Sequence, residues 1–158
     1  MSDAPPLHPD VAPLAPLLGS WKGKGSGTYP GIDDFEYLEM VTFTQVGKPF
    51  IAYTQRTRDA STGAPLHAET GYLRTVGGDR GEFLIAQPSG VVEVHDVEFG
   101  RNSLLMTSQQ VVSTPTAKQV DAVARQIRIE GDDLVYELHM AAMGHPMQRH
   151  LEARLTRD

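Results

Sequence analysis

The sequence contains no cysteine among its 158 residues. Disulfides, thiolate catalysis, iron–sulfur clusters and zinc sites built on cysteine are therefore excluded. A bound metal would have to use histidine, carboxylate, methionine or tyrosine side chains. An excess of basic residues is also lacking, because 14 Lys and Arg face 20 Asp and Glu and give a formal net charge of −6. This balance argues against binding to nucleic acid or to an anionic membrane surface.

Long apolar segments are absent too, since no run approaches the roughly 20 residues that cross a bilayer. The first residues, "MSDAPPLHPD", are acidic and proline-rich, and they lack the basic and apolar regions of a secretory signal. We therefore expect a cytoplasmic protein. The length is that of one domain, which we expect at residues 11–158 after a flexible tail at residues 1–10.

Helical periodicity is scarce. Only "VAPLAPLL" (11–18) suggests a short helical segment, and its two prolines keep it short. Elsewhere apolar and polar residues alternate with period two, and glycine, proline and aspartate interrupt the pattern. The alternation predicts about ten strands, at 21–29, 35–46, 50–58, 67–76, 81–87, 90–99, 103–112, 120–129, 134–143 and 148–156.

Closely spaced strands joined by short turns favour an antiparallel sheet that closes into a barrel or folds into a sandwich. A barrel is favoured because closure removes exposed strand edges. A barrel of about eight strands already has room for one small ligand. With aromatic residues at only 7%, a larger barrel should enclose a cavity. We predict an all-β, about ten-stranded antiparallel barrel of the lipocalin or fatty-acid-binding-protein type, with a short N-terminal helical segment.

The stretch "GSWKGKGSGTY" (19–29) places Gly23, Gly25 and Gly27 on one face of a strand. The bare backbone suits a tight bend or the close approach of a flat ligand. A G-x-W-x-G-x-G pattern also opens the barrel in many lipocalin-like proteins, where the tryptophan plugs one end. We favour this structural role, with Trp21 as the plug, over a direct ligand contact.

The polar residues do not define a reactive centre by spacing alone. No histidine pair has the spacing of a zinc site. We expect His95 to face solvent, and we expect the same of most of the carboxylates Asp33, Asp34, Glu36, Glu39 and Glu69, so that no acid–base pair is identified. In the last strand, period two turns Leu151 inward and His150 outward. A bulge after the "GHP" turn would turn His150 inward, or both faces would be partly covered.

Six segments match a known family: "PLLGSWKGKGSGTYPGIDDFEYLEMVTF", "VGKPF", "PLHAETGYLR", "PSGVVEV", "PTAKQV" and "GHPMQRHL". Through them the chain resembles the nitrobindins, small heme-binding β-barrel proteins, over residues 13–155. The resemblance implies a ten-stranded barrel that holds heme b at one open end. In that family the histidine of the closing "HL" pair is the proximal iron ligand, and this position is His150 here.

The resemblance also implies further contacts with the heme. They are His67 with its neighbour Leu66 on the distal side, Met140 and Thr28 in the pocket, and Lys118 and Arg125 beside the propionates. Nitrobindins bind nitric oxide, and their ferric form isomerises peroxynitrite to nitrate. The resemblance therefore implies an enzyme with one heme b per chain and small-molecule ligands. No acid–base pair is required, because ferric iron acts as a Lewis acid.

Two other functions are compatible with the sequence. The G-x-W motif is common among binding proteins, so the barrel would be a noncatalytic carrier or sensor of heme, nitric oxide or a small hydrophobic ligand. A structural β-domain with a vestigial cavity is the third reading. The sequence is compatible with either a monomer or a homodimer.

Overall fold

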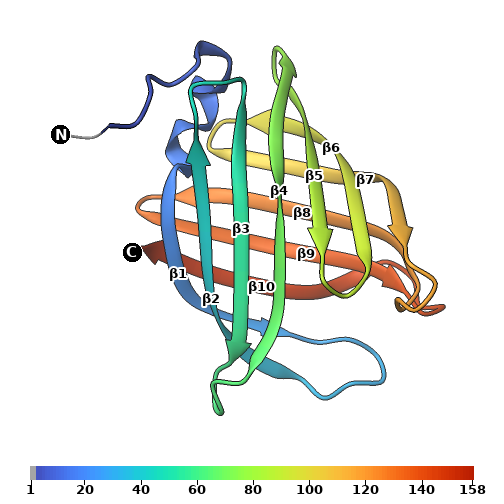
Figure 1. Cartoon of the computed structure of the whole chain (residues 1–158). Helices are drawn as coiled ribbons and strands as arrows, with labels where there is room; N and C mark the ends of the chain where they lie inside the picture. The colour runs from blue at the N-terminus through green and yellow to red at the C-terminus, as the bar shows by residue number, and fades with distance from the viewer. Residues whose placement is uncertain (1–2) are drawn as a thin grey trace.

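The computed structural model describes residues 3–158, which form a closed antiparallel barrel of ten strands (Figure 1). Each strand pairs with the next along the chain, and β1 pairs with β10 to close the barrel. All ten predicted strands are confirmed, each within two residues of its predicted bounds. The strands are β1 (Gly19–Gly27), β2 (Phe35–Gln45), β3 (Phe50–Asp59), β4 (Pro65–Gly77), β5 (Arg80–Gln87), β6 (Val91–Gly100), β7 (Ser103–Ser113), β8 (Val120–Glu130), β9 (Asp133–Ala142) and β10 (Gln148–Arg157).

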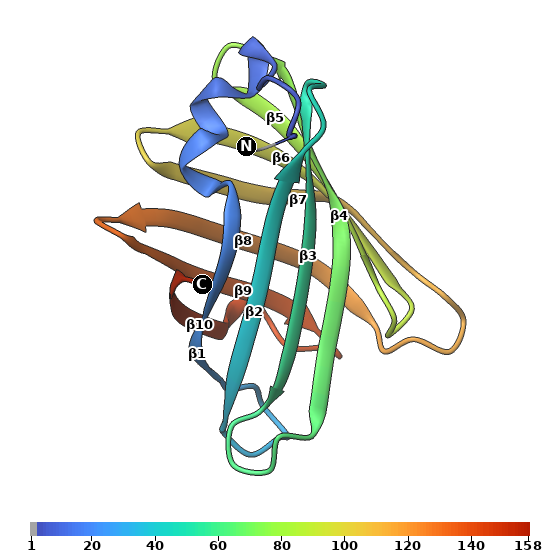
Figure 2. The ribbon, with the colours of Figure 1, turned by 60° about the vertical axis from the view of Figure 1, so that its left-hand side comes forward.

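The barrel is flattened, because β1–β4 cross steeply over β7–β10 (Figure 1 and Figure 2).

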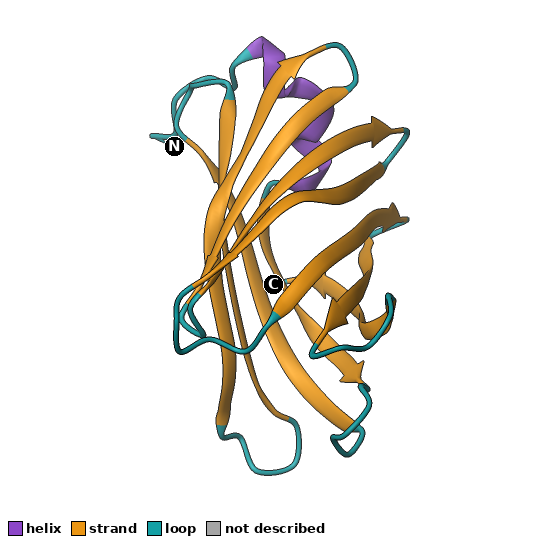
Figure 3. Cartoon of the chain, turned by 90° about the vertical axis from the view of Figure 1, so that its right-hand side faces the viewer, coloured by secondary structure: helices purple, strands orange, loops and turns teal. Residues whose placement is uncertain are grey.

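The two ends of the barrel differ. In an up-and-down barrel, alternate loops lie at the same end, so the β1–β2, β3–β4, β5–β6, β7–β8 and β9–β10 loops share one end. The helix η1 (Pro9–Leu17) lies at the other end (Figure 3). Within residues 3–158, no helix has the length and apolar character needed to cross a bilayer.

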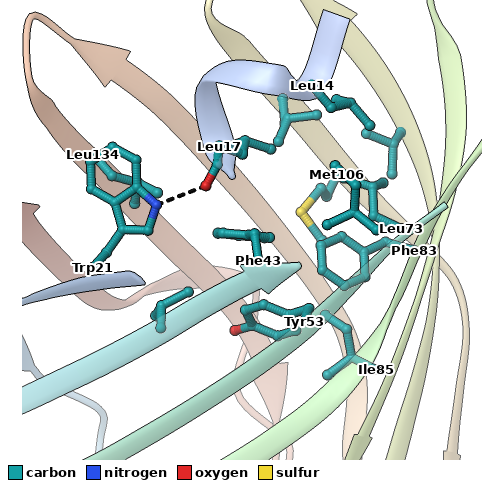
Figure 4. Close-up of a cluster of buried hydrophobic side chains, with 14 of the residues drawn as sticks. Leu14, Leu17, Trp21, Phe43, Tyr53, Leu73, Phe83, Ile85, Met106 and Leu134 are labelled. Carbon is teal, nitrogen blue, oxygen red and sulfur yellow. Dashed lines mark hydrogen bonds between the residues drawn. The ribbon is translucent and has the colours of Figure 1, made fainter. Parts of the chain in front are cut away.

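The helix η1 and Trp21 close their end of the barrel. The predicted helical segment at 11–18 is a 3₁₀ helix that buries Val11, Leu14 and Leu17. Trp21 is fully buried beside it, and its indole Nε1 donates a hydrogen bond to the Leu17 carbonyl over 2.8 Å (Figure 4). Trp21 therefore has the plugging role that the sequence motif predicts.

The predicted tail overlaps this helix. Pro9 and Asp10 belong to η1, and the Pro5 carbonyl accepts a hydrogen bond from Gln45 Nε2 over 2.7 Å. Residues 1 and 2 of the predicted tail lie outside the described residues. The flexibility of the segment before η1 stays a prediction.

The apolar core fills the half of the barrel next to η1. Phe43, Tyr53, Phe83 and Met106 come from four strands and pack within one cluster (Figure 4). Tyr53 contacts both rings, with centroid distances of 5.3 Å to Phe43 and 5.1 Å to Phe83. Further from η1, inward positions of β2 and β3 carry the buried polar side chains Glu39 and Gln55, which border a cavity.

The glycines of β1 make room for aromatic rings of β2. A Cβ at Gly25 would overlap the Tyr37 ring, and a Cβ at Gly27 would overlap the Phe35 ring. The other interpretation of these glycines, a surface for a flat ligand, is wrong at these two positions, because protein rings already cover the backbone.

Candidate functional site

The barrel encloses a cavity of about 540 Å³. This volume lies within the range of about 300–1,000 Å³ that is usual for small-molecule and cofactor pockets. The cavity reaches the end opposite η1, where exposed Ile32 and Lys118 border it. Its apolar wall includes Phe35, Val41, Phe43, Leu66, Val91, Val120, Val123, Ile127, Leu134, Leu138, Met140 and Leu151. The predicted interior cavity is therefore present.

A second hollow of about 1270 Å³ runs along the outside of β1–β4. It is larger, but its lining includes the exposed side chains Lys22, Lys24, Arg56 and Arg58 on the outer face of the strands. Neither His150 nor Met140 lies in its lining. The inner cavity is therefore the candidate site.

His150 reaches the inner cavity because β10 contains a bulge. Arg149 pairs with His139 and Leu151 pairs with Leu138, so His150 is the extra residue between two paired ones. A bulge interrupts the alternation of side chains along a strand. Consequently His150 and Leu151 both line the cavity. Of the two alternatives that the sequence leaves open, the bulge is the one found.

A hydrogen bond fixes the tautomer of His150. Its Nδ1 lies 3.0 Å from the carbonyl oxygen of Thr28, and the Thr28 N–H donates to the His150 carbonyl over 2.9 Å. Because a carbonyl can only accept, Nδ1 carries the proton and Nε2 keeps its lone pair. Burial lowers the pKa of His150 below its usual value, against the Thr28 hydrogen bond. A neutral imidazole with a free nitrogen is the form that binds heme iron.

Aromatic rings hold His150 on two sides. The ring of Tyr29 lies edge-on with centroids 5.3 Å apart, and the ring of Phe35 lies 6.4 Å away. The Tyr29 hydroxyl accepts a hydrogen bond from the Ala142 N–H over 2.9 Å and donates to the Met140 carbonyl over 3.2 Å. Tyr29 thus ties the β1–β2 loop to β9. Sequence reasoning did not assign it a role, and the "TYP" motif was the only signal.

The fold brings five of the other predicted residues to the same cavity as His150. They are Leu66 and His67 from β4, Met140 from β9, Lys118 from the β7–β8 loop and Arg125 from β8. Thr28 is different, because its carbonyl holds His150 while its side chain is not part of the cavity lining. Apart from Arg125, which is described next, the direct contacts of these residues with a heme stay predictions.

Arg125 lies inside the barrel between two buried glutamates. Its Nη1 is 2.6 Å from Glu69 Oε2, and its Nη2 is 2.8 Å from Glu93 Oε2. Both carboxylate side chains are only 3% exposed. The predicted pairing of Arg125 with a heme propionate is wrong, because these two carboxylates already occupy its guanidinium.

The expectation that His95 faces solvent is also wrong, since His95 is buried. Two of the five carboxylates, Glu39 and Glu69, are buried as well. His95 Nε2 lies 2.7 Å from Glu93 Oε1, and His67 Nε2 lies 3.0 Å from Glu69 Oε1. A continuous ionic chain therefore crosses the barrel, consisting of His67, Glu69, Arg125, Glu93 and His95.

In the middle of this ionic chain, the Arg125 guanidinium lies between the carboxyl groups of Glu69 and Glu93. Burial alone raises the pKa of Glu69, but Arg125 and His67 outweigh it and bring the pKa down to about 2. Burial also raises the pKa of Glu93, but Arg125 and His95 outweigh this effect and bring the pKa below its usual value. Both groups are therefore carboxylates near neutral pH, and the Arg125 cation between them is fully charged.

Glu39 stands apart from the ionic chain. Its Oε1 accepts a hydrogen bond from the Tyr136 hydroxyl over 2.7 Å, and its Oε2 accepts one from Gln55 Nε2 over 2.9 Å. Burial raises the pKa of Glu39 to about 7, and these two hydrogen bonds offset only part of that effect. Glu39 is therefore a buried acid that titrates near neutral pH.

Replacing Glu39 with glutamine should remove a pH dependence of stability. Because the folded pKa of Glu39 is raised, its contribution is fully present below about pH 4.5 and is lost as the pH rises through about 7. We expect the wild type to lose about 2–3 kcal/mol more unfolding free energy than Glu39→Gln between about pH 5 and 8. Urea unfolding at both pH values measures this difference. Glu36→Gln, which changes an exposed glutamate, serves as the control. If the unfolding free energy of Glu39→Gln changed with pH as much as that of the wild type, the raised pKa of Glu39 would be contradicted.

The residues around the cavity fit a heme. Within the described part of the chain, no three His, Asp or Glu side chains gather to hold a bare metal ion. A heme brings its own porphyrin nitrogens and would need one protein ligand, for which the free Nε2 of His150 is available. The apolar wall suits the macrocycle, and Lys118 at the mouth suits a propionate.

Comparison with known proteins supports this fit. The chain matches the THAP4-like, heme-binding β-barrel domain over residues 10–157. Peroxynitrite isomerase 1 of Mycolicibacterium paratuberculosis is 53% identical over 156 residues, which covers 96% of this chain and 97% of the relative. Peroxynitrite isomerase 2 of Mycobacterium marinum is 51% identical over 155 residues and covers 96% of each chain.

A solved structure agrees as well. The crystal structure of Rv2717c from M. tuberculosis is 45% identical, superposes with a TM-score of 0.91, and covers 97% of this chain and 99% of its own. Since the family model and these relatives span almost the whole chain, the protein belongs to the family of THAP4-like, heme-binding β-barrel domains, in agreement with its resemblance to the nitrobindins.

Proposed function

We propose that the protein binds one heme b in the barrel cavity through His150 and that its ferric form isomerises peroxynitrite to nitrate. The observation that carries the proposal is the bulge, which turns His150 into the cavity with Nε2 free and Nδ1–H held by Thr28. Relatives at 53% and 51% identity that are named peroxynitrite isomerase support the reaction.

The residues of the site would each contribute in a distinct way. The Thr28 carbonyl orients His150, as outer hydrogen-bond partners do for metal-bound histidines. Tyr29 and Phe35 limit the rotation of the ring. Side chains such as Met140 keep water out of the cavity, which strengthens electrostatic interactions inside it.

When bound, ferric heme supplies a Lewis acid that polarises the O–O bond of peroxynitrite. The chain itself then needs to bind, orient and shield the substrate, and no nucleophile is required. The proposal includes nitric oxide as a second ligand, and a protein that acts in the cytoplasm as a monomer or homodimer.

The experiment is stopped-flow decay of peroxynitrite with the ferric, heme-loaded protein. We expect the decay rate to rise in proportion to protein concentration and the product to be nitrate, while heme-free protein gives no acceleration. Heme binding without acceleration would reject the enzyme and favour the carrier or sensor. A failure to bind heme would reject the proposal as a whole.

A further inference from the structure

His67 is connected to the ionic chain through a buried carboxylate. Its side chain lines the cavity, and its Nε2 lies 3.0 Å from Glu69 Oε1. The other oxygen of Glu69 accepts hydrogen bonds from the Tyr53 hydroxyl over 2.8 Å and from Arg125 Nη1 over 2.6 Å. Arg125 in turn is held by three hydrogen bonds to Glu93. Tyr53 and Arg125 therefore hold Glu69 in place, and its Oε1 lies at hydrogen-bond distance from His67.

This arrangement determines which ring nitrogen of His67 carries the proton. Arg125 and His67 keep Glu69 ionised, and an ionised carboxylate can only accept hydrogen bonds. Hence Nε2 of His67 is the protonated nitrogen. In the neutral ring Nδ1 then keeps its lone pair, and within residues 3–158 no hydrogen-bond partner of Nδ1 is seen. The His67 side chain is 33% exposed, so solvent and ligands reach it.

We propose that Glu69, held by Arg125, is a positioning residue that makes His67 a proton acceptor at Nδ1 for the acid form of the substrate. The inference rests on the proposed function. In this step the O–H bond of peroxynitrous acid breaks, an Nδ1–H bond forms, and the electron pair stays on the oxygen of the peroxynitrite anion. The proton returns to water after nitrate has left.

The surroundings of His67 suit this step. The charge that forms on the ring is compensated by Glu69, which lies between His67 and Arg125. The other titratable groups that line the same cavity include Glu39, Glu93, Tyr136, Lys118 and His150. None of these groups is within ion-pair distance of His67, whereas Glu69 is. A positioned general base contributes about 10²–10⁴-fold to a rate.

The first test uses the heme-free protein and nitrogen NMR. At about pH 8.5, well above the ordinary histidine pKa of about 6.5, the ¹⁵N shifts of His67 should report a single Nε2–H tautomer. In Glu69→Gln the amide can accept or donate, so we expect a mixture of tautomers. Glu82→Gln is the matched control, because Glu82 is an exposed glutamate paired with Arg74, and it should leave the His67 shifts unchanged. Unchanged His67 shifts in Glu69→Gln would overturn the positioning role.

The second test measures peroxynitrite decay with the heme-loaded variants near neutral pH, because the step needs both the acid form of the substrate and an uncharged His67 ring. We expect the second-order rate constant to fall about 10²-fold in His67→Gln and about tenfold in Glu69→Gln. His67→Gln leaves Glu69 and Arg125 in place, so it tests the acceptor without disturbing their ion pair. Wild-type rates in both variants would overturn the acceptor role.

The two tests separate the inference from the function on which it rests. If the wild-type protein binds heme but does not accelerate the decay, the proposed function fails and the proton-accepting step fails with it. The tautomer measurement still decides whether Glu69 positions His67. If the decay is accelerated and neither variant differs from the wild type, only the further inference fails.

Discussion

Replacing His150 with alanine is expected to lower the affinity for heme by more than about 100-fold. Changes to the outer partners of a metal ligand already cost about 10–100-fold, and this change removes the ligand itself. Among the histidines that line the cavity, only His150 has its Nδ1 tied to a backbone carbonyl and its Nε2 left free for iron. A heme titration followed by absorbance measures the loss.

The matched control is His139→Ala, which removes a histidine that is not part of the cavity lining. This variant should bind heme as the wild type does. Denaturation curves for both variants show whether the barrel is intact, since His150 sits at a strand bulge rather than in the apolar core. Wild-type heme affinity in folded His150→Ala would show that another side chain holds the iron.

The strands were predictable because their signals are local. Alternation and turn residues lie within a few positions of one another, and all ten predicted segments became strands. The plug was predictable for the same reason, since "GSW" places Trp21 directly after the segment that becomes η1. Closure followed from the number of strands and from the cost of leaving their edges unpaired.

The orientation of His150 was not predictable from periodicity. One extra residue in β10 shifts the alternation, and nothing in the spacing of "QRHLEARL" indicates where this residue lies. The family resemblance selected His150 as the ligand, and the bulge supplies the physical reason. The Thr28 carbonyl that holds the ring was equally hidden, because backbone contacts between distant segments leave no composition signal.

The buried polar groups were missed although a signal existed. Period two puts Glu39 on the same face of β2 as Val41 and Phe43, and both of these residues are buried. It likewise puts Arg125 on the cavity face of β8 beside Val123 and Ile127. Most carboxylates were assigned to solvent because burial is costly without a partner. The partners lie on other strands, and only the closed barrel brings them together.

Replacing Arg125 with methionine is expected to cost about 3–5 kcal/mol of unfolding free energy near neutral pH. The change removes the cation between Glu69 and Glu93 and leaves two buried carboxylates without a counter-charge. Removing one partner of a buried ionic set costs more stability than replacing the whole set. Arg128→Met is the control on the same strand, because the Arg128 side chain is 42% exposed and its ion pair with Glu130 is worth at most about 1 kcal/mol. Urea unfolding measures both variants.

The pH dependence of this loss has a definite sign. In the wild type the folded pKa values of Glu69 and Glu93 are lowered, so their contribution is present above the ordinary carboxyl pKa and is lost as the pH falls through the lowered values. Without Arg125, burial is no longer offset and the folded pKa values rise. Stability of the variant should then fall as the pH increases, and the gap to the wild type should be wider at about pH 8 than at about pH 5.

A triple variant shows whether buried charge causes the loss of stability, even where Arg125→Met does not fold. Changing Glu69 and Glu93 to glutamine in the Arg125→Met background removes the uncompensated charges and keeps the side-chain size. If buried charge is the cause, the triple variant should regain most of the lost stability, since replacing a whole buried ionic set costs far less than breaking it. A triple variant as unstable as Arg125→Met would instead assign the loss to packing, and Arg125 would then stabilise the barrel through its shape and not through its charge.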